Sequence, residues 1–277
     1  MLGHHLNKKS LLFVALLLSV SLASVAILSG RVRNPLASHG PARAGRMKNF
    51  PPVILWAWER PAHLDFINPR EVGVAFLAKT IFLRGESVSE RPRLQPLSVP
   101  PGTMLIAVAR IESDRREQAS LSDTQLAHTA AKIAELAHLP NIAAVQVDFD
   151  ARLSERDFYR ALLLELRRRL PEGLPLSVTA LASWCTHDDW LDQLPLDEAV
   201  PMLFRMGVDR SQTLSYLAGG AQFRSKLCRQ SVGISTDETP PTGLPLKGRI
   251  YVFSTEEWSP ASVQQIIERS KNEPTDS

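Results

Sequence analysis

Eight apolar runs alternate with helical or loop-like segments from residue 51 onward. Short apolar runs rich in Val, Ile and aromatic residues and bounded by turn residues are typical of strands. The runs predict strands at 53–59, 72–83, 103–111, 143–150, 175–183, 198–206, 230–236 and 248–254.

Three of the intervening segments carry clear helical signals. Residues 124–138 are amphipathic. Ser154 with Asp157 three residues later is a capping-box pattern, and the helix that it begins is expected to end at Pro171. The Ser-Pro pair at 259–260 is typical of a helix N-cap followed by proline at the first helical position.

Strands that alternate with helices predict a parallel sheet with right-handed crossovers. Eight units in about 220 residues fit a small (β/α)8 TIM barrel, which we predict over residues 51–272. A doubly wound open sheet is the alternative, but residues 56–63 lack the Gly-rich turn that such a sheet needs after its first strand. The first two connections are weaker, since residues 85–101 form a Pro-rich loop, and residues 273–277 are expected to be a disordered tail.

The amino-terminal part of the chain has the pattern of an export signal. Residues 11–28 carry no charge and follow Lys8 and Lys9. The apolar run is long for a signal peptide and borderline for a membrane span, so residues 1–30 are predicted to be a signal peptide or a membrane anchor. We therefore expect an exported protein, periplasmic or anchored in the inner membrane facing the periplasm.

The positive net charge comes from the first fifty residues. Residues 1–50 hold seven Lys and Arg and no acid, which leaves 25 basic against 29 acidic residues in 51–277. Residues 31–50 are therefore predicted to be a basic linker, and the folded part has no electrostatic basis for nucleic-acid binding. Any membrane contact is expected only through the amino-terminal segment. No motif such as H-x-x-H predicts a metal site, and no cofactor is expected.

The stretch 143–152 (AAVQVDFDAR) carries the main candidate chemistry. In a strand, Gln146, Asp148 and Asp150 share one face, and Val145, Val147 and Phe149 share the other. In a barrel the aliphatic face packs under helices, so the polar face points into the lumen and Asp150 stands at the carboxyl-terminal rim.

Burying two acids costs several kcal/mol unless partners neutralise them. Lys79 and Arg110, late in neighbouring strands, could neutralise Asp148 in a purely structural ion network. An active site and such a network are therefore alternative interpretations of this strand.

The two cysteines are expected to be unpaired. Cys185 follows the fifth strand and Cys228 precedes the seventh, which suggests opposite rims of the barrel. The ends of a six-residue strand are roughly 20 Å apart, whereas a disulfide needs Cα atoms within about 7 Å.

Tryptophans gather near the carboxyl ends of the predicted strands. Trp58, Trp184 and Trp258 all fall at this rim and could stack on sugar rings, while Trp56 could instead face outward into the core. Arg205 is expected to point inward, because an arginine under the helices would be a buried unpaired charge. Alternation then sends Met202 and Phe204 outward.

The strand 143–150 resembles that of the glycosidase-type TIM barrels, chitinase-like enzymes among them, which carry D-x-D-x-E on strand 4. Here 146–150 read Gln-Val-Asp-Phe-Asp, and the M-x-Y-D of strand 6 reads Met-Leu-Phe-Arg at 202–205. That alignment places Met202 and Phe204 inward, and a bulge would satisfy both readings. Residues 52–255 look more like an uncharacterised bacterial domain-of-unknown-function family placed among the glycosidase barrels. The resemblance implies a TIM barrel and Asp150 as proton donor.

The first functional hypothesis is an exported glycoside hydrolase-like protein acting on a cell-envelope or other polysaccharide. Asp150 would be the general acid, with a pKa raised by the lumen and by Asp148. A second carboxylate would act as base or nucleophile, the candidates being Glu59, Glu112 and Glu256. Assistance by a substrate N-acetyl group would remove that need, but Phe204 replaces the tyrosine that would orient the group.

The alternative hypothesis is a non-catalytic carbohydrate-binding or scaffold barrel in the envelope. Its glycan would contact Trp58, Gln146, Trp184, Arg205 and Trp258, with hydrogen bonds to the two aspartates. A purely structural domain that binds a protein partner is a third class.

Overall fold

The computed structural model describes residues 45–239 and 248–272, and within them eight parallel strands close into a barrel. The first strand pairs with both the second and the last strand of the barrel, which closes the cylinder and rules out the open sheet. The predicted TIM-barrel fold is confirmed, and each predicted strand overlaps an observed one. The barrel strands are β1 (Val53–Ala57), β3 (Val72–Arg84), β6 (Leu105–Ser113), β7 (Ile142–Asp148), β8 (Leu176–Leu181), β9 (Glu198–Met202), β10 (Ser231–Ser235) and β11 (Arg249–Phe253).

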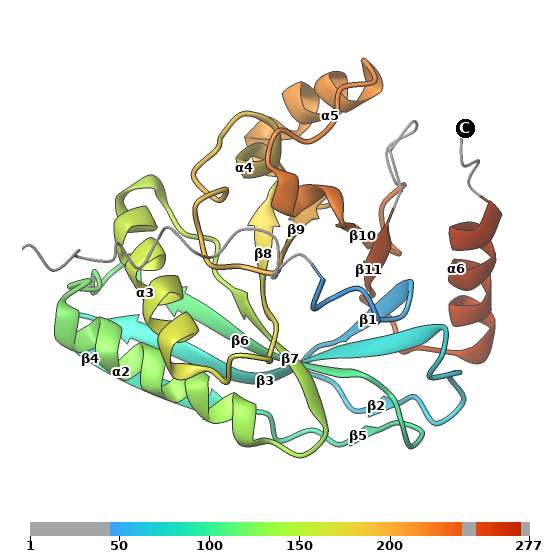
Figure 1. Cartoon of the computed structure of the whole chain (residues 1–277), viewed down its shortest axis with the longest axis horizontal. Coiled ribbons are helices and arrows are strands. Elements are labelled where there is room, and N and C mark those ends of the chain that lie inside the picture. Colours follow the sequence, from blue (N-terminus) through green and yellow to red (C-terminus); the bar gives the residue numbers. More distant parts are fainter. Residues whose placement is uncertain (1–44, 240–247, 273–277) are drawn as a thin grey trace, which may run out of the picture. The chain divides into compact units, whose positions relative to one another are not determined.

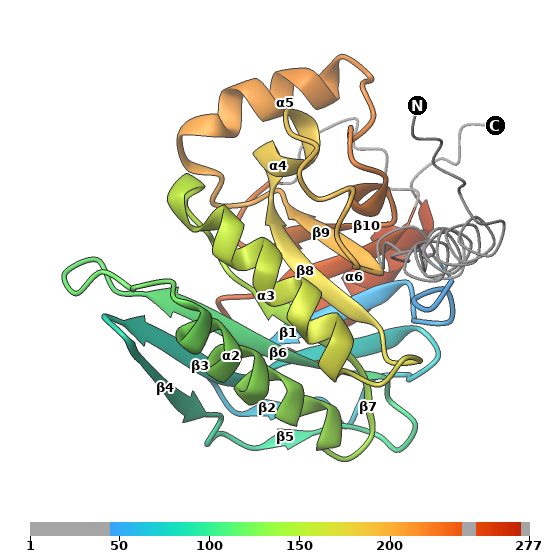
Figure 2. The same ribbon diagram turned by 60° about the vertical axis from the view of Figure 1, so that its left-hand side comes forward.

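Helices follow the later strands, as the sequence pattern indicates. Figure 1 shows α2 and α3 side by side over one flank of the barrel, and Figure 2 shows α4 and α5 gathered beyond the ends of β8 and β9. The α-helices are α2 (Asp123–Ala134), α3 (Arg156–Arg169), α4 (Ala182–Thr186), α5 (Arg210–Ala218) and α6 (Pro260–Asn272). Short 3-10 helices are η1 (Glu135–His138), η2 (Leu153–Glu155), η3 (Gly207–Asp209) and η4 (Lys226–Arg229).

The first two connections contain strands where a regular barrel has helices. The strand β4 (Ser87–Pro92) extends β3 as an antiparallel hairpin, and β2 (Ala62–His63) pairs with β5 (Leu97–Ser98). These connections are the ones for which the sequence carries weak helical signals.

Local capping explains where the helices begin. The Ser122 side chain accepts a hydrogen bond from the Gln125 amide at the start of α2, and Ser259 accepts one from the Ser262 amide at the start of α6. Ser154 does not cap α3, whose N-cap residue is Glu155 and has no side-chain capping bond. The Glu155 carboxylate instead accepts from the Arg152 amide at 2.7 Å at the start of η2. The helix α3 ends at Arg169, close to the predicted stop at Pro171.

Alternate residues of the strands face two separate cores. Val145, Val147 and Phe149 are buried between the barrel and its helices, as predicted. The lumen holds a second apolar cluster that includes Ile54 and Val108. Both faces of the barrel strands are therefore buried, which explains their nearly continuous apolar runs.

Residues 45–50, which were predicted to belong to the linker, pack against the amino-terminal ends of the strands. Met47 is fully buried in the lumen cluster and Phe50 packs against that cluster. Arg46 pairs with Asp197 at 3.4 Å. These contacts close the lower end of the lumen.

The predicted signal peptide or anchor at 1–30, the linker residues before 45 and the predicted tail at 273–277 lie outside the described residues. No helix within 45–239 or 248–272 combines the length and apolarity needed to cross a membrane.

The prediction of two unpaired cysteines is wrong, because Cys185 and Cys228 form a disulfide with Cα atoms 5.9 Å apart. The α4 helix begins directly after β8 and turns back against β9, and η4 packs against the same strand before β10 begins. The two connections therefore meet outside the barrel wall instead of at opposite rims.

Removing this disulfide should lower stability substantially. The bond closes a loop of 43 residues, for which chain entropy gives about 4 kcal/mol of stabilisation. The double variant Cys185→Ala/Cys228→Ala should lose up to that free energy of unfolding in urea denaturation. Reductant should destabilise the wild type and leave the double variant unchanged. Two thiols that alkylate in the unreduced wild type would contradict the bond.

Candidate functional site

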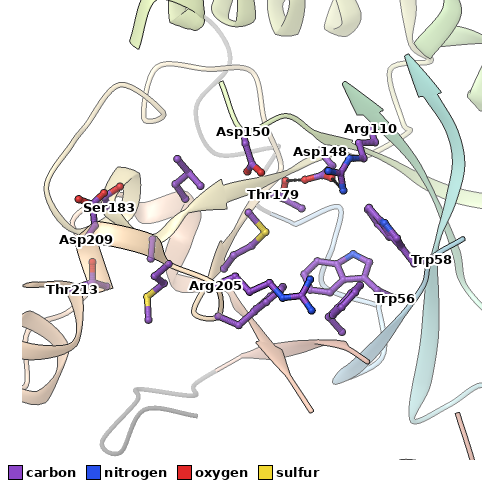
Figure 3. A pocket seen from close by; sticks show the side chains of 16 residues that line it. Trp56, Trp58, Arg110, Asp148, Asp150, Thr179, Ser183, Arg205, Asp209 and Thr213 are labelled. Carbon is purple, nitrogen blue, oxygen red and sulfur yellow. Dashed lines mark hydrogen bonds and ion pairs between the residues drawn. The ribbon is translucent and has the colours of Figure 1, made fainter. Parts of the chain in front are cut away.

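A cavity of about 360 Å³ opens at the carboxyl-terminal end of the barrel strands. Active sites of TIM barrels lie at this end. Two aspartates and a threonine from β7 and β8 line one side, aromatic residues from β1, β9 and β11 line another, and residues of α4, η3 and α5 line the far end (Figure 3).

Asp148 is the last residue of β7 and is held from two sides. The Thr179 hydroxyl donates a hydrogen bond to Asp148 Oδ1 at 2.6 Å, and an Arg110 guanidinium nitrogen lies 3.9 Å from Oδ2. Burial raises the pKa of Asp148 to about 6, with a further contribution from the charge of Asp150. The hydrogen bond from Thr179 and the charge of Arg110 oppose that rise without cancelling it.

Arg110 neutralises Asp148 only in part. Its Nε lies 3.0 Å from Glu112 Oε1, so its charge is shared between two carboxylates. Its guanidinium also lies 5.7 Å from the centroid of the Trp58 ring. Of the two predicted partners of Asp148, Arg110 is therefore the one that the structure supplies.

Lys79, the other predicted partner, points away from the lumen. Its ammonium lies 2.8 Å from carboxylate oxygens of both Glu90 and Glu135 outside the barrel. The register between β3 and β6 shifts after Leu77, and this bulge turns Lys79 to the outer face. A lumen ion network with Lys79 is thus excluded.

Asp150 lies just beyond β7 and is exposed at the mouth of the cavity. The surrounding walls reduce its hydration and raise its pKa, and the charge of Arg110 opposes this. Among the residues that the structure describes, no group donates a hydrogen bond to its carboxylate. Asp148 is thus fixed, whereas Asp150 is free to reach a ligand.

Aromatic rings form the wall opposite the acids. Phe204 and Phe253 stack with ring centroids 5.8 Å apart, and Trp58 meets Phe253 edge-on at 6.2 Å. The Arg205 guanidinium lies 5.0 Å from the centroid of the Phe253 ring. Such a wall offers apolar faces to the C–H face of a sugar ring, with charged groups at its border.

Trp56 faces the lumen, not the outer core. Its Nε1 donates a hydrogen bond to Gln146 Oε1 at 3.0 Å, so Trp56 forms the floor of the cavity and the fully buried Gln146 holds its indole. A Cβ added to Gly233 on β10 would lie 3.0 Å from the Trp56 ring. Glycine in this strand therefore makes room for the indole.

A chain of buried polar groups continues from this floor to the bottom of the barrel. Gln146 Nε2 donates to the Ser177 hydroxyl at 3.1 Å, and Ser177 donates to Glu198 at 3.5 Å. Glu198 also accepts from Tyr251 at 2.6 Å and pairs with Arg249. Burial and the neighbouring carboxylate raise the pKa of Tyr251 well above its ordinary value, so the phenol stays protonated and donates.

Arg205 lines the cavity, but it lies in a turn beyond β9, where strand alternation no longer applies. The strand β9 ends at Met202, and Arg205 has a left-handed backbone (φ 52°) in the following turn. Its amide donates to Glu238 and its side chain lies 3.4 Å from Asp237. The expectation that Met202 and Phe204 face outward is wrong. Met202 continues the inward alternation of Glu198 and Val200 along β9, and the turn brings Phe204 and Arg205 to the cavity wall.

Four predicted residues do not line the cavity, and one of them, Gln146, is fully buried and bonded to the Trp56 indole. Trp184 is buried against Tyr159 and Trp190, with ring centroids 6.4 Å and 5.0 Å away. Trp258 lies behind β1, where its Nε1 donates to the Trp56 carbonyl at 3.3 Å. Glu59 is exposed and paired with Arg91.

Sequence reasoning missed five of the polar and aromatic lining residues: Thr179, Phe253, Ser183, Asp209 and Thr213. The first two continue the inward alternation of β8 and β11, a signal that was available in the sequence. The other three come from helical segments that fold over the rim, and no local pattern marks them.

No three His, Cys, Asp or Glu side chains in 45–239 and 248–272 gather closely enough to hold a metal ion. The polar groups of the cavity are carboxylates, hydroxyls and guanidinium groups. They can donate and accept hydrogen bonds, transfer a proton and stabilise a charge.

Among solved structures, the chain is similar to the Bacillus cereus spore cortex-lytic enzyme SleL, at 16% identity and a TM-score of 0.43 over 69% of this chain. It is also similar to the chitinase domain of the spore coat protein CotE from Clostridium difficile, at 12% identity and a TM-score of 0.36 over 55% of this chain. The chain spans about half of each, 55% and 49%. The assignment of the barrel rests on the strand pairing described above.

No protein-family model and no curated protein matches the chain.

The raised pKa of Asp148 should make stability depend on pH. The folded protein holds this proton more tightly than the unfolded chain, so the stabilisation is present at low pH and is lost as the pH rises through about 6. A rise from 3.8 to about 6 corresponds to about 3 kcal/mol. From about pH 4 to pH 7, the wild type should lose up to that amount relative to Asp148→Asn, measured by urea denaturation.

The variant Glu172→Gln changes an exposed residue and serves as the control for this experiment. Its free energy of unfolding should follow that of the wild type at every pH. Parallel pH curves for the wild type and Asp148→Asn would show that Asp148 is not the group that titrates.

Gly233→Ala should disturb the floor of the cavity. The added methyl group would press against the Trp56 ring and the Pro201 carbonyl, and overpacking of this kind costs about 1–3 kcal/mol. The thermal unfolding midpoint should fall, and the tryptophan fluorescence should shift. Gly173→Ala, at a position with open space around it, is the matched control. An unchanged midpoint in Gly233→Ala would mean that Trp56 does not pack as described.

Proposed function

We propose that the protein is an exported glycoside hydrolase-like enzyme that cleaves a polysaccharide of the cell envelope, with Asp150 as general acid. The observation that carries this proposal is the pair Asp148 and Asp150, both with a raised pKa, facing an aromatic wall at the catalytic end of the barrel. Acid catalysis at a glycosidic oxygen needs a carboxylic acid that keeps its proton near the working pH.

The two acids have different surroundings, which supports different roles. Asp150 is exposed and unengaged, so it can donate its proton to the leaving oxygen of a bound glycan. Asp148 is held by Thr179 and cannot swing toward a ligand. When ionised, Asp148 would stabilise the positive charge that develops at the anomeric carbon in the transition state.

The glutamates predicted as a second catalytic carboxylate do not line the cavity. Glu59 pairs with Arg91 outside the cavity, and Glu112 pairs with Arg110. Asp148 is therefore the carboxylate that we propose as the partner of Asp150. The charge of Asp150 helps to raise the pKa of Asp148, so the titrations of the two acids are coupled.

Export is part of the proposal and has one structural support. A disulfide joins Cys185 and Cys228, and such bonds form and persist in oxidising compartments, the bacterial periplasm among them. The apolar segment 11–28 would direct the chain there.

A non-catalytic carbohydrate-binding barrel is the second candidate. It is favoured by Phe204 and Arg205, which stand where chitinase-like barrels have tyrosine and aspartate. In that case the aromatic wall and the two acids would hold a glycan without cleaving it.

Asp150→Asn separates the two candidates. The purified protein is incubated with peptidoglycan and a panel of polysaccharides, and new reducing ends and co-sedimentation are measured. For an enzyme, the variant should lose turnover by at least about 100-fold, because general acid catalysis contributes that much, and should still bind the polysaccharide. In the wild type, kcat/KM should fall as the pH rises and the Asp150 carboxyl, whose pKa is raised, loses its proton.

Glu172→Gln, far from the cavity on an exposed turn, is the matched control and should retain full turnover. Co-sedimentation without cleavage in the wild type would favour the binding barrel. Turnover that survives in Asp150→Asn would refute this residue as the acid, and a wild type that neither binds nor cleaves would refute both candidates.

A further inference from the structure

The far end of the cavity holds a second group of polar side chains, which we call the polar end: Ser183, Asp209 and Thr213. Ser183 lies in the first turn of α4, Asp209 is the last residue of η3, and Thr213 lies one turn further on in α5. Figure 3 shows these three side chains gathered at the end of the cavity opposite Trp58 and Arg110.

The hydroxyl of Thr213 is buried and has no hydrogen-bond partner, and its side chain is fully inaccessible to solvent. Threonines inside helices ordinarily bond to the carbonyl four residues back, as Thr129 does to Gln125 at 2.8 Å. Thr213 does not make this bond and lines the cavity. Since an unsatisfied buried hydroxyl is costly, its persistence here points to a partner that the residues in 45–239 and 248–272 do not provide.

The other two side chains of the polar end are also unused. Within the described part of the chain, neither the Ser183 hydroxyl nor the Asp209 carboxylate takes part in a hydrogen bond or an ion pair through its side chain. The neighbouring Arg210 pairs with Glu238 at 2.7 Å and leaves Asp209 without a counter-charge. The polar end therefore offers two hydroxyls and one carboxylate to a ligand.

This set of groups fits the hydroxyls of a neutral sugar. A carboxylate accepts hydrogen bonds from hydroxyl groups, and the serine and threonine hydroxyls both donate and accept. Apolar side chains of Leu181, Ala182 and Met206 also line the cavity. They match the apolar faces of sugar rings that run from one end to the other.

We propose that the polar end binds the hydroxyls of a second sugar ring, so that the site recognises an oligosaccharide and not a single sugar. This inference rests on the proposed carbohydrate-binding function. The cavity of about 360 Å³ exceeds the volume of one pyranose ring, and its polar end lies opposite Trp58 and Arg110 (Figure 3). Affinity should therefore increase with the number of rings that reach the polar end.

The test uses Thr213→Val, which removes the hydroxyl and keeps the shape of the side chain. Binding of the mono-, di- and tetrasaccharides of N-acetylglucosamine, and of the same series of glucose, is measured by calorimetry. One neutral hydrogen bond corresponds to about three- to ten-fold in affinity. The variant should bind the tetrasaccharide more weakly by that factor and the monosaccharide as the wild type does. Thr213→Ser, which keeps the hydroxyl, should restore the tetrasaccharide affinity.

Two further variants sharpen the result. Ser211→Ala removes an exposed hydroxyl from the same helix outside the cavity and should leave all affinities unchanged. Asp209→Asn keeps an acceptor oxygen, so it should weaken tetrasaccharide binding less than Asp209→Ala does. A loss that is equal in both, and that added salt reproduces in the wild type, would show recognition of a cationic group and would overturn the inference.

The outcomes separate this inference from the proposed function. Equal effects of Thr213→Val on the monosaccharide and the tetrasaccharide, or no effect on either, would overturn the second-ring subsite while the function stands. Thermal unfolding of Thr213→Val serves as the folding control. The loss of an unpaired hydroxyl should not lower the unfolding midpoint. A wild type that binds no member of either series would overturn the function and this inference together.

Discussion

The buried ion pair between Glu198 and Arg249 is the constraint on which the barrel interior depends. Both side chains lie in the lumen at the amino-terminal ends of β9 and β11. Arg249 also donates to the carbonyls of Met47 and Pro51, so the same guanidinium holds the segment that closes the barrel. A buried pair of this kind is tolerable only when its remaining hydrogen-bonding groups are used, and here the backbone and Tyr251 use them.

The hydrogen-bond network of the lumen ends at the floor of the cavity, where Trp56 lies. Below it, a chain of hydrogen bonds runs from the Trp56 indole through Gln146 and Ser177 to Glu198, each residue donating to the next. Above it, Asp148 keeps a raised pKa, and the Thr213 hydroxyl has no partner. The described part of the fold thus satisfies the polar groups of its lumen and keeps an acid with a raised pKa and an unpaired hydroxyl at the place where a ligand could offset their cost.

The sequence predicted the barrel because the evidence for it is local and periodic. Each strand is a run of apolar residues, and the two faces of β7 follow from simple alternation, which placed Gln146 and Asp148 inward. Alternation fails wherever the backbone is irregular. A bulge in β3 turns Lys79 outward, and a left-handed turn at Arg205 brings Phe204 into the cavity. No glycine or proline stands at Ala78 or at Arg205, so the sequence does not predict either irregularity.

Loop paths were the other part that the sequence could not predict. The position of a residue along a strand says little about the direction that the chain takes once the strand ends. Cys185 and Trp184 were placed at the rim because they follow β8, yet α4 turns down against β9 and buries both. The same turn brings Cys185 to Cys228 and explains the bond that strand geometry alone excluded.

Two residues that do not line the cavity, Trp184 and Cys185, help to position one that does, Ser183. Trp184 and Cys185 follow Ser183 directly in α4, so neighbouring positions of one short helix face different surroundings. The packing of Trp184 on Trp190 and the disulfide to η4 fix the outer side of this helix. A helix of five residues would have little stability alone, since isolated short helices are marginal in water. The buried tryptophan and the disulfide thus hold Ser183 in place at the polar end, where a loop free to move could not present its hydroxyl with a fixed geometry.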